Sequence, residues 1–259
     1  MDEYLNMEVK EVISKFPEAA RVLDEYNIGC TVCNAGSCLL KDIVEIHSLS
    51  SDEEQELMAK LARVVYPGRD VKVLEVGRKP KAKPERVKYS PPLKKLVDEH
   101  LLIKRWIALI PKLAESLDVN TEEGRQLVLQ GVDFIRTYAD RYHHAKEEEV
   151  LFKYFDENLE ILKTMHADHE KARSHVRSIL QAVEEKNGEA VKEHLNAYRE
   201  LLTEHIKKED EILYPWMDRG LSLTQVGELF SRFNELEEQF QTVPEKYEEF
   251  IRKLEEKFR

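Results

Sequence analysis

The chain has 259 residues, of which 42% are hydrophobic and 35% are charged. This length and hydrophobic content are enough to bury one good core or two modest ones, so we expect a protein that folds without help. Its formal net charge of −11 argues against binding to nucleic acid or to an anionic membrane, because both partners repel an acidic surface.

The composition predicts an all-α fold. Charged residues are abundant while Gly and Pro number only nine each, which is typical of long helices with a solvent-facing side. No stretch resembles a signal peptide or an apolar span of about 20 residues, so we expect a cytoplasmic protein without a membrane partner.

The N-terminal part is predicted to be a small helical domain over residues 1–67. Apolar residues recur at helical spacing through 9–26 and again through 52–65, where either Ser51 or Asp52 has a side chain typical of an N-cap. Between these stretches lie Cys30, Cys33 and Cys38. An odd number of clustered cysteines indicates a metal or redox site rather than a disulfide framework.

Residues 68–92 are predicted to be a linker, because prolines and basic residues interrupt the helical pattern there. Within this segment 71–76 alternates apolar and polar residues, which is compatible with a short extended piece. The basic residues could dock an acidic partner, but charges that keep a linker solvated are the preferred interpretation.

Four long amphipathic segments follow, and short polar connections between them favour an antiparallel bundle. We predict a bundle domain over 93–219 and a helical C-terminal extension over 220–259. The predicted helices of the bundle are 93–117, 122–156, 159–186 and 189–217, and those of the extension are 224–240 and 243–258.

A His-x-x-x-Glu motif occurs twice, 62 residues apart, as His143 to Glu147 and His205 to Glu209. Residues four apart share a helix face, so each copy offers an imidazole beside a carboxylate. The 62-residue shift aligns His143, rather than His144, with His205. We therefore predict that His143 is the neighbour that points into the bundle.

The first and third bundle helices place one histidine each, His100 and His169, in their apolar stripes. A single such histidine is more often a core residue bonded to a carbonyl than a metal ligand. Histidines in the apolar stripes of three facing helices favour a metal site instead. The acidic neighbours Glu99 and Asp168 are candidates for tuning it.

The predicted donor set comprises four imidazoles and two carboxylates, with no thiolate, which suits iron or manganese better than structural zinc. Six ligands are too many for one ion with an open position, so we expect two ions bridged by Glu147 and Glu209. The Glu-x-x-His motif of ferritin-like sites and the His-Glu-x-x-His motif of zinc proteases do not occur in the sequence.

The series of histidines and His-x-x-x-Glu motifs, followed by Glu-Glu-Glu-Val-Leu-Phe and Glu-Asp-Glu-Ile-Leu-Tyr-Pro, resembles the hemerythrin-like HHE cation-binding family. The resemblance implies a four-helix bundle holding two Fe ions with oxo and carboxylate bridges. The ligands that it implies are His100, His143, Glu147, His169, His205 and Glu209.

Two departures from oxygen-carrying hemerythrins shift the expected function away from oxygen transport. Those proteins end in His-x-x-x-x-Asp and carry two histidines four apart on the third helix. Here the fourth helix has His-x-x-x-Glu, and His166 lies only three residues before His169. We interpret His166 as a flanking group.

The N-terminal domain is similar to the small helical domain that precedes the bundle in di-iron proteins that repair iron–sulfur centres. Cys30, Cys33 and Cys38 stand where those proteins carry adjacent cysteines. They could be redox-active thiols, or ligands of an iron–sulfur cluster that a partner or the second subunit of a homodimer completes. Simple burial of three small residues is the remaining alternative.

The resemblance implies a stress protein that repairs, or supplies iron to, damaged iron–sulfur centres, with iron–sulfur proteins or a redox protein as partners. Two alternatives remain open. One is reversible binding of O2 or NO for sensing or storage, and the other is reduction of NO or peroxide at the two irons.

Overall fold

The computed structural model describes residues 2–26, 28, 39–41, 43, 49, 51–67 and 89–258. Their regular structure is helical, apart from one isolated bridge between Glu8 and Leu39, which confirms the all-α prediction. The chain forms two compact units, Met1–Lys88 with Lys208–Gly220 and Tyr89–Lys207 with Leu221–Arg259. The three cysteines and the predicted extended piece 71–76 lie outside the described residues.

The first unit is built from short helices around an apolar cluster that includes Val12, Leu23 and Leu61. Helix α5 begins at Ser51, so both residues predicted as possible caps, Ser51 and Asp52, lie within the helix instead. The elements are α1 (Asp2–Leu5), α2 (Val9–Lys15), α3 (Glu18–Glu25), α5 (Ser51–Val65), the π-helix η4 (Glu209–Leu213) and α10 (Tyr214–Gly220).

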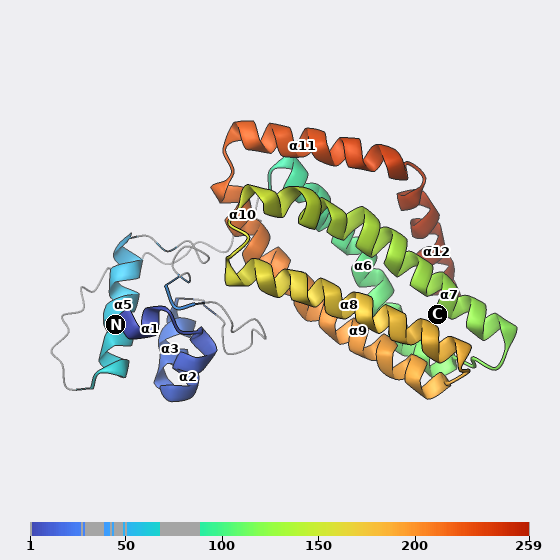
Figure 1. Cartoon of the computed structure of the whole chain (residues 1–259), viewed down its shortest axis with the longest axis horizontal. Coiled ribbons are helices and arrows are strands. Elements are labelled where there is room, and N and C mark those ends of the chain that lie inside the picture. The colour runs from blue at the N-terminus through green and yellow to red at the C-terminus, as the bar shows by residue number, and fades with distance from the viewer. Residues whose placement is uncertain are drawn as a thin grey trace. The chain divides into compact units, whose positions relative to one another are not determined.

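The second unit contains the long helices of the predicted bundle, which lie side by side in Figure 1 and share one apolar core. They are α6 (Pro91–Ser116), α7 (Glu122–Phe134) continued by η1 (Ile135–His144), η2 (Glu147–Leu151) and η3 (Phe152–Tyr154), then α8 (Glu160–Glu184) and α9 (Gly188–Lys208). The C-terminal elements are α11 (Leu223–Glu237), η5 (Glu238–Phe240) and α12 (Val243–Lys257).

Local signals fix where these helices begin. Two prolines occupy the first turn of α6, where their missing N–H groups cost no helical hydrogen bond. The Thr121 hydroxyl accepts a bond from the Gly124 N–H at 3.1 Å and so caps α7. Ser222 and Gln225 form a capping box at the start of α11.

The second bundle helix departs from the predicted continuous α-helix. Its backbone changes at Ile135 to π-helical hydrogen bonding, in segments that carry His143, His144 and Glu147. The sequence repeat extends to this feature, because the π-helices Glu147–Leu151 and Glu209–Leu213 are themselves 62 residues apart. Short π segments inside α-helices are often found at functional sites.

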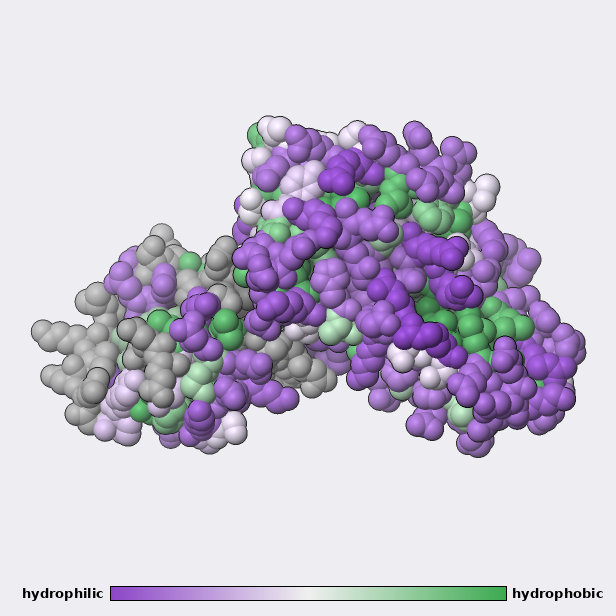
Figure 2. Space-filling model, viewed as in Figure 1, coloured by the Kyte–Doolittle hydropathy of each residue, from purple (hydrophilic) through white to green (hydrophobic). Residues whose placement is uncertain are grey.

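The C-terminal helices pack on the bundle. Helix α11 contacts α6 and η2, and helix α12 contacts α6 and η1. Aromatic contacts between Phe134, Tyr138 and Tyr247 join α12 to the core. On the face shown in Figure 2, hydrophilic residues cover most of this unit, in keeping with its charged composition. Among the residues that the structure describes, no helix is both long and apolar enough to cross a membrane.

Candidate metal centre

Five of the six predicted ligands lie in the second unit, and all five are buried. His100 and Glu147 are 0% exposed, and His143, His169 and His205 are each 1% exposed. Burying so many polar groups in an apolar bundle is costly unless each of them is compensated. The interior of the bundle is therefore specialised for more than packing.

The imidazoles meet in two pairs. His100 Nε2 lies 2.9 Å from His143 Nε2, and His169 Nε2 lies 3.0 Å from His205 Nε2. Two imidazoles bound to one ion at right angles, with bonds of about 2.1 Å, would have their nitrogens about 3.0 Å apart. Each pair is thus already spaced as adjacent ligands of one metal ion.

Carboxylates at the outer nitrogens direct the inner ones toward the centre. His143 Nδ1 lies 2.9 Å from Glu99, and His169 Nδ1 lies 2.6 Å from Glu148. A carboxylate accepts a hydrogen bond, so the Nδ1 atom of each of these two histidines is the donor. The Nε2 atom of each ring then carries the lone pair that a metal needs. Glu99 was a predicted tuning residue, and its contact with His143 agrees with that role.

The other predicted tuning residue, Asp168, contacts His205 Nδ1 at 3.4 Å. With Nδ1 of both His169 and His205 acting as donors to carboxylates, both Nε2 atoms would offer lone pairs, and a cation bound between them would accept both. The chemistry of the donor set therefore fits a metal ion.

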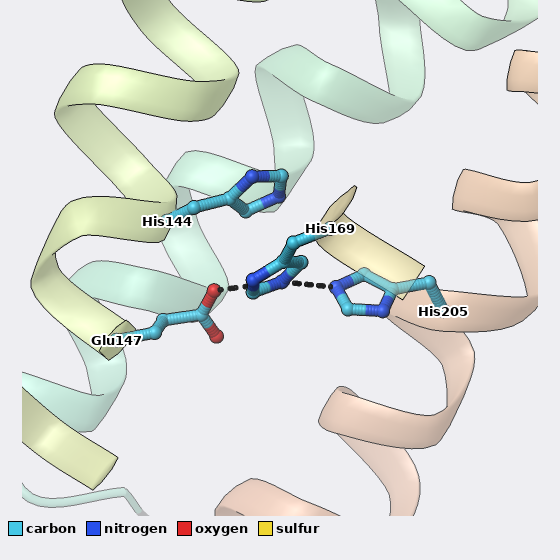
Figure 3. A group of neighbouring side chains, drawn as sticks. All are labelled: His144, Glu147, His169 and His205. Carbon is cyan, nitrogen blue, oxygen red and sulfur yellow. Dashed lines mark hydrogen bonds and ion pairs between the residues drawn. The ribbon is translucent and has the colours of Figure 1, made fainter. Parts of the chain in front are cut away.

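Glu147 lies between the two pairs of imidazoles. Its Oε2 atom is 3.5 Å from His169 Nε2 and 3.8 Å from His143 Nε2. Figure 3 shows the carboxylate pointing from its helix toward His169 and His205. The Glu147 carboxylate is therefore close to imidazoles of both pairs.

His144, predicted to lie on a polar strip, is also buried, at 3% exposure. Its ring stacks on His169, with 3.9 Å between ring centroids and 15° between planes (Figure 3). Donor atoms of His144, Glu147, His169 and His205 all lie within 4.8 Å of one another. A prediction based on α-helical spacing missed this because His144 ends a π-helix, whose wider turn changes which residues face inward.

A buried lysine backs the first pair of imidazoles. Lys146 is 0% exposed and donates hydrogen bonds to Glu99 and, at 2.8 Å, to Glu237 of α11. Its ammonium also lies 3.6 Å from the centre of the Tyr142 ring. Burial raises the pKa of Glu99 to about 7, and the positive charge of Lys146 works against this rise.

A second cation, Arg173, binds carboxylates near the pair formed by His169 and His205. Its guanidinium donates to Asp140 at 2.9 Å and to both oxygens of Glu148 at 3.0 Å. Burial alone would raise the pKa of Asp140, but hydrogen bonds with His144 and Arg173 outweigh it and lower the pKa to about 2. Arg173 thus holds carboxylates that face two of the buried histidines.

The sixth predicted ligand, Glu209, is also fully buried and begins the π-helix η4. It is grouped with the first compact unit, so its place among the ligands stays a prediction from the repeat. His166 has 41% of its side chain exposed and lies 3.9 Å from Glu148, at the edge of the cluster. The predicted site at Cys30, Cys33 and Cys38 lies outside the described residues.

A cavity of about 350 Å³ reaches the ligands from the side of α8. His144 and His169 form part of its wall, together with apolar residues such as Val176 and the buried Tyr198. Arg136 and Arg177, which also line it, are exposed. A small molecule in this cavity would therefore lie against His144 and His169.

Comparison with protein families gives one match, to the hemerythrin family, described as the hemerythrin HHE cation-binding domain, over residues 92–217. No curated protein and no solved structure matches the chain. The matched segment runs from the first turn of α6 into α10 and includes all the predicted histidine and glutamate ligands. The match and the clustered His and Glu side chains support cation binding by this part of the chain.

Proposed function

We propose that this protein is a non-haem di-iron protein, with one iron held by His100 and His143 and the other by His169 and His205. The observation that carries the proposal is the spacing of these imidazoles in two buried pairs, at 2.9 and 3.0 Å. Glu147, placed between the pairs, would bridge the two ions, with Glu209 as the second bridge that the repeat predicts.

When bound, iron would supply Lewis acidity and one-electron redox chemistry. The protein's own residues prepare the site for it. Glu99 and Glu148 hold the Nδ1 protons of His143 and His169, and the ligand side chains of the bundle are almost fully buried.

Metal analysis tests the proposal directly. Protein purified without air and loaded with ferrous iron should hold two irons per chain, measured by Mössbauer spectroscopy and elemental analysis. His205→Ala should lose them, whereas His194→Ala, a half-buried histidine on the same helix, should retain both. Iron binding that survives His205→Ala unchanged would contradict the proposal.

For the cellular role we propose repair of, or iron supply to, iron–sulfur centres damaged under oxidative or nitrosative stress. Support comes from the presence on one chain of an HHE metal domain and a cluster of Cys30, Cys33 and Cys38, the combination that resembles the di-iron repair proteins. In this role the thiols would dock a client iron–sulfur protein or exchange electrons with it.

The repair role can be tested with a dehydratase whose iron–sulfur cluster has been damaged. The iron-loaded protein should restore its activity, and Cys30→Ala together with Cys33→Ala should abolish the effect while leaving the iron content unchanged. Failure of the unaltered, iron-loaded protein to restore activity would reject repair without affecting the metal assignment.

The cavity beside His144 and His169 favours a second candidate function, reversible binding of O2 or NO. Air titration of the reduced, iron-loaded protein distinguishes the possibilities. A stable adduct with a charge-transfer absorption supports binding, and rapid oxidation without an adduct opposes it. Sustained consumption of NO or peroxide with a reductant would instead indicate a reductase.

A further inference from the structure

We infer that His144 is a fifth imidazole ligand, on the metal position that His169 and His205 share. The inference rests on the proposed metal function but assigns a ligand that neither the repeat nor the family resemblance provides. It makes the two metal positions unequal, with three imidazoles on one and two on the other.

The first support is the position of the side chain. His144 is 3% exposed, and one of its nitrogens lies within 4.8 Å of donor atoms of Glu147, His169 and His205. Ligands around one ion with bonds of about 2.1 Å lie at most about 4.2 Å apart. A small inward movement is therefore enough to complete the set.

The second support is the carboxylate behind the ring. Asp140 Oδ1 lies 3.5 Å from His144 Nδ1, and Arg173 holds Asp140 in place at 2.8 Å. Glu148 stands behind His169 in the same way and is held by the same arginine. With Nδ1 facing Asp140, His144 would coordinate a metal through Nε2.

The ring has room to make this movement. To coordinate a metal, the His144 ring would turn about χ2 and give up its stacking contact with His169. The χ2 torsion of histidine has a broad and shallow energy profile. The cavity on its outer side gives the ring space to turn. Figure 3 shows His144 directly above His169, on the side of the cluster away from Glu147.

The repeat identifies the asymmetry. A shift of 62 residues matches His143 with His205 and Glu147 with Glu209, but it matches His144 with Ile206. Ile206 is 1% exposed, so both positions are buried, one with a donor atom and the other without. The chain itself thus supplies the substitution that would remove the extra ligand.

The test compares His144→Ile, which copies the second half of the repeat, and His144→Gln, which keeps a polar side chain, with the control His194→Gln. Each is loaded with ⁵⁷Fe and studied by Mössbauer spectroscopy and by X-ray absorption, which counts imidazoles per iron. The unaltered protein should give two distinct quadrupole doublets of equal area and five imidazoles per two irons.

In both His144 variants one doublet should shift while the other stays, the imidazole count should fall to four, and one iron should be bound about tenfold more weakly or worse. The control should behave like the unaltered protein. Two unchanged doublets and an unchanged imidazole count in His144→Gln would overturn the inference alone. Absence of iron binding by the unaltered protein would overturn the proposed function as well.

Discussion

At the scale of single residues, carboxylates stand at the outer nitrogens of four buried imidazoles, those of His143, His144, His169 and His205. Lys146 contacts Glu99, and Arg173 contacts Glu148 and Asp140, so these three carboxylates each have a cationic partner. A buried charge without a partner is strongly destabilising. The cations therefore make the orienting carboxylates tolerable inside the bundle.

We expect Arg173→Met to weaken metal retention by about 10- to 100-fold, the usual effect of removing a group that orients metal ligands. The substitution frees Asp140 and Glu148, which then no longer fix the rings of His144 and His169. Competition with a coloured chelator measures the affinity. Arg177→Met, one turn further and paired with exposed Glu170, is the control and should change little.

From the sequence we predicted a set of ligands, but only part of the layer of charged side chains that contacts them. Spacing along one helix relates His143 to Glu147. By contrast, Glu148 is hydrogen-bonded to His169, 21 residues away, and Glu237 to Lys146, 91 residues away. Such pairs depend on how helices pack against one another. Glu99 and Asp168 were predictable because they adjoin a predicted ligand directly in sequence.

At the scale of the helices, the regular α-helical period describes the bundle well until it meets the site. The bounds of α6 and α8 lie close to those predicted, because long apolar stripes and short polar connections define them. Helix α9 begins close to where it was predicted but ends at Lys208, and the rest of the predicted helix is divided between η4 and α10. The π segments were not predicted, since a periodicity of 3.6 residues was assumed throughout. His144 was misplaced onto a polar strip for this reason.

Helix α7 approaches α6 closely at Gly131. A Cβ atom there would lie 2.4 Å from the indole ring of Trp106, which is 0% exposed. We expect Gly131→Ala to lower the free energy of unfolding by about 1–3 kcal/mol through overpacking.

Gly227→Ala is the matched control, because a Cβ at this position in α11 meets nothing within 4 Å. It should raise the free energy of unfolding by about 0.5–1 kcal/mol, the gain from Gly to Ala inside a helix. Denaturant titration of the two variants measures both changes. Equal effects of the two substitutions would show that the α6–α7 contact is looser than described.

Helix α11 reaches the metal centre through Glu237. Its carboxylate accepts bonds from Lys146 at 2.8 Å and from Lys95 at 2.6 Å, and these bonds lower its pKa although burial opposes them. We expect Glu237→Gln to lower the free energy of unfolding by about 2 kcal/mol, the loss of a partly buried charged hydrogen bond.

A double-mutant cycle with Lys146→Met isolates this contact. The two substitutions together should cost less than the sum of each alone, by about 1–2 kcal/mol, because they remove the same interaction. Strict additivity would mean that α11 is not coupled to the centre through Lys146.

At the scale of the whole molecule, the buried donors lie in one part of the chain and the three cysteines in another. The second unit holds a cluster of buried donors and most of the segment that matches the HHE family, and both observations support cation binding. The role of the three cysteines rests on their number and spacing in the sequence. A resemblance, rather than a contact, therefore supports the step from metal binding to repair.

Metal binding should stabilise the second unit as a whole, because the donors converge only when α6, α7 with its π segments, α8 and α9 are assembled. An ion that binds only the folded state adds about 2.7 kcal/mol when free metal is 100-fold above its dissociation constant. For a domain of this size that corresponds to a rise in melting temperature of about 5–10 °C per ion.

Calorimetry without air, with and without ferrous iron, measures this shift. His205→Ala, which removes one imidazole of a pair, should lose most of the rise, and His194→Ala should keep it. The rise should also shrink on acidification, because protons compete with the metal for imidazole nitrogens. An iron-dependent rise of the same size in His205→Ala would mean that the metal binds elsewhere on the chain.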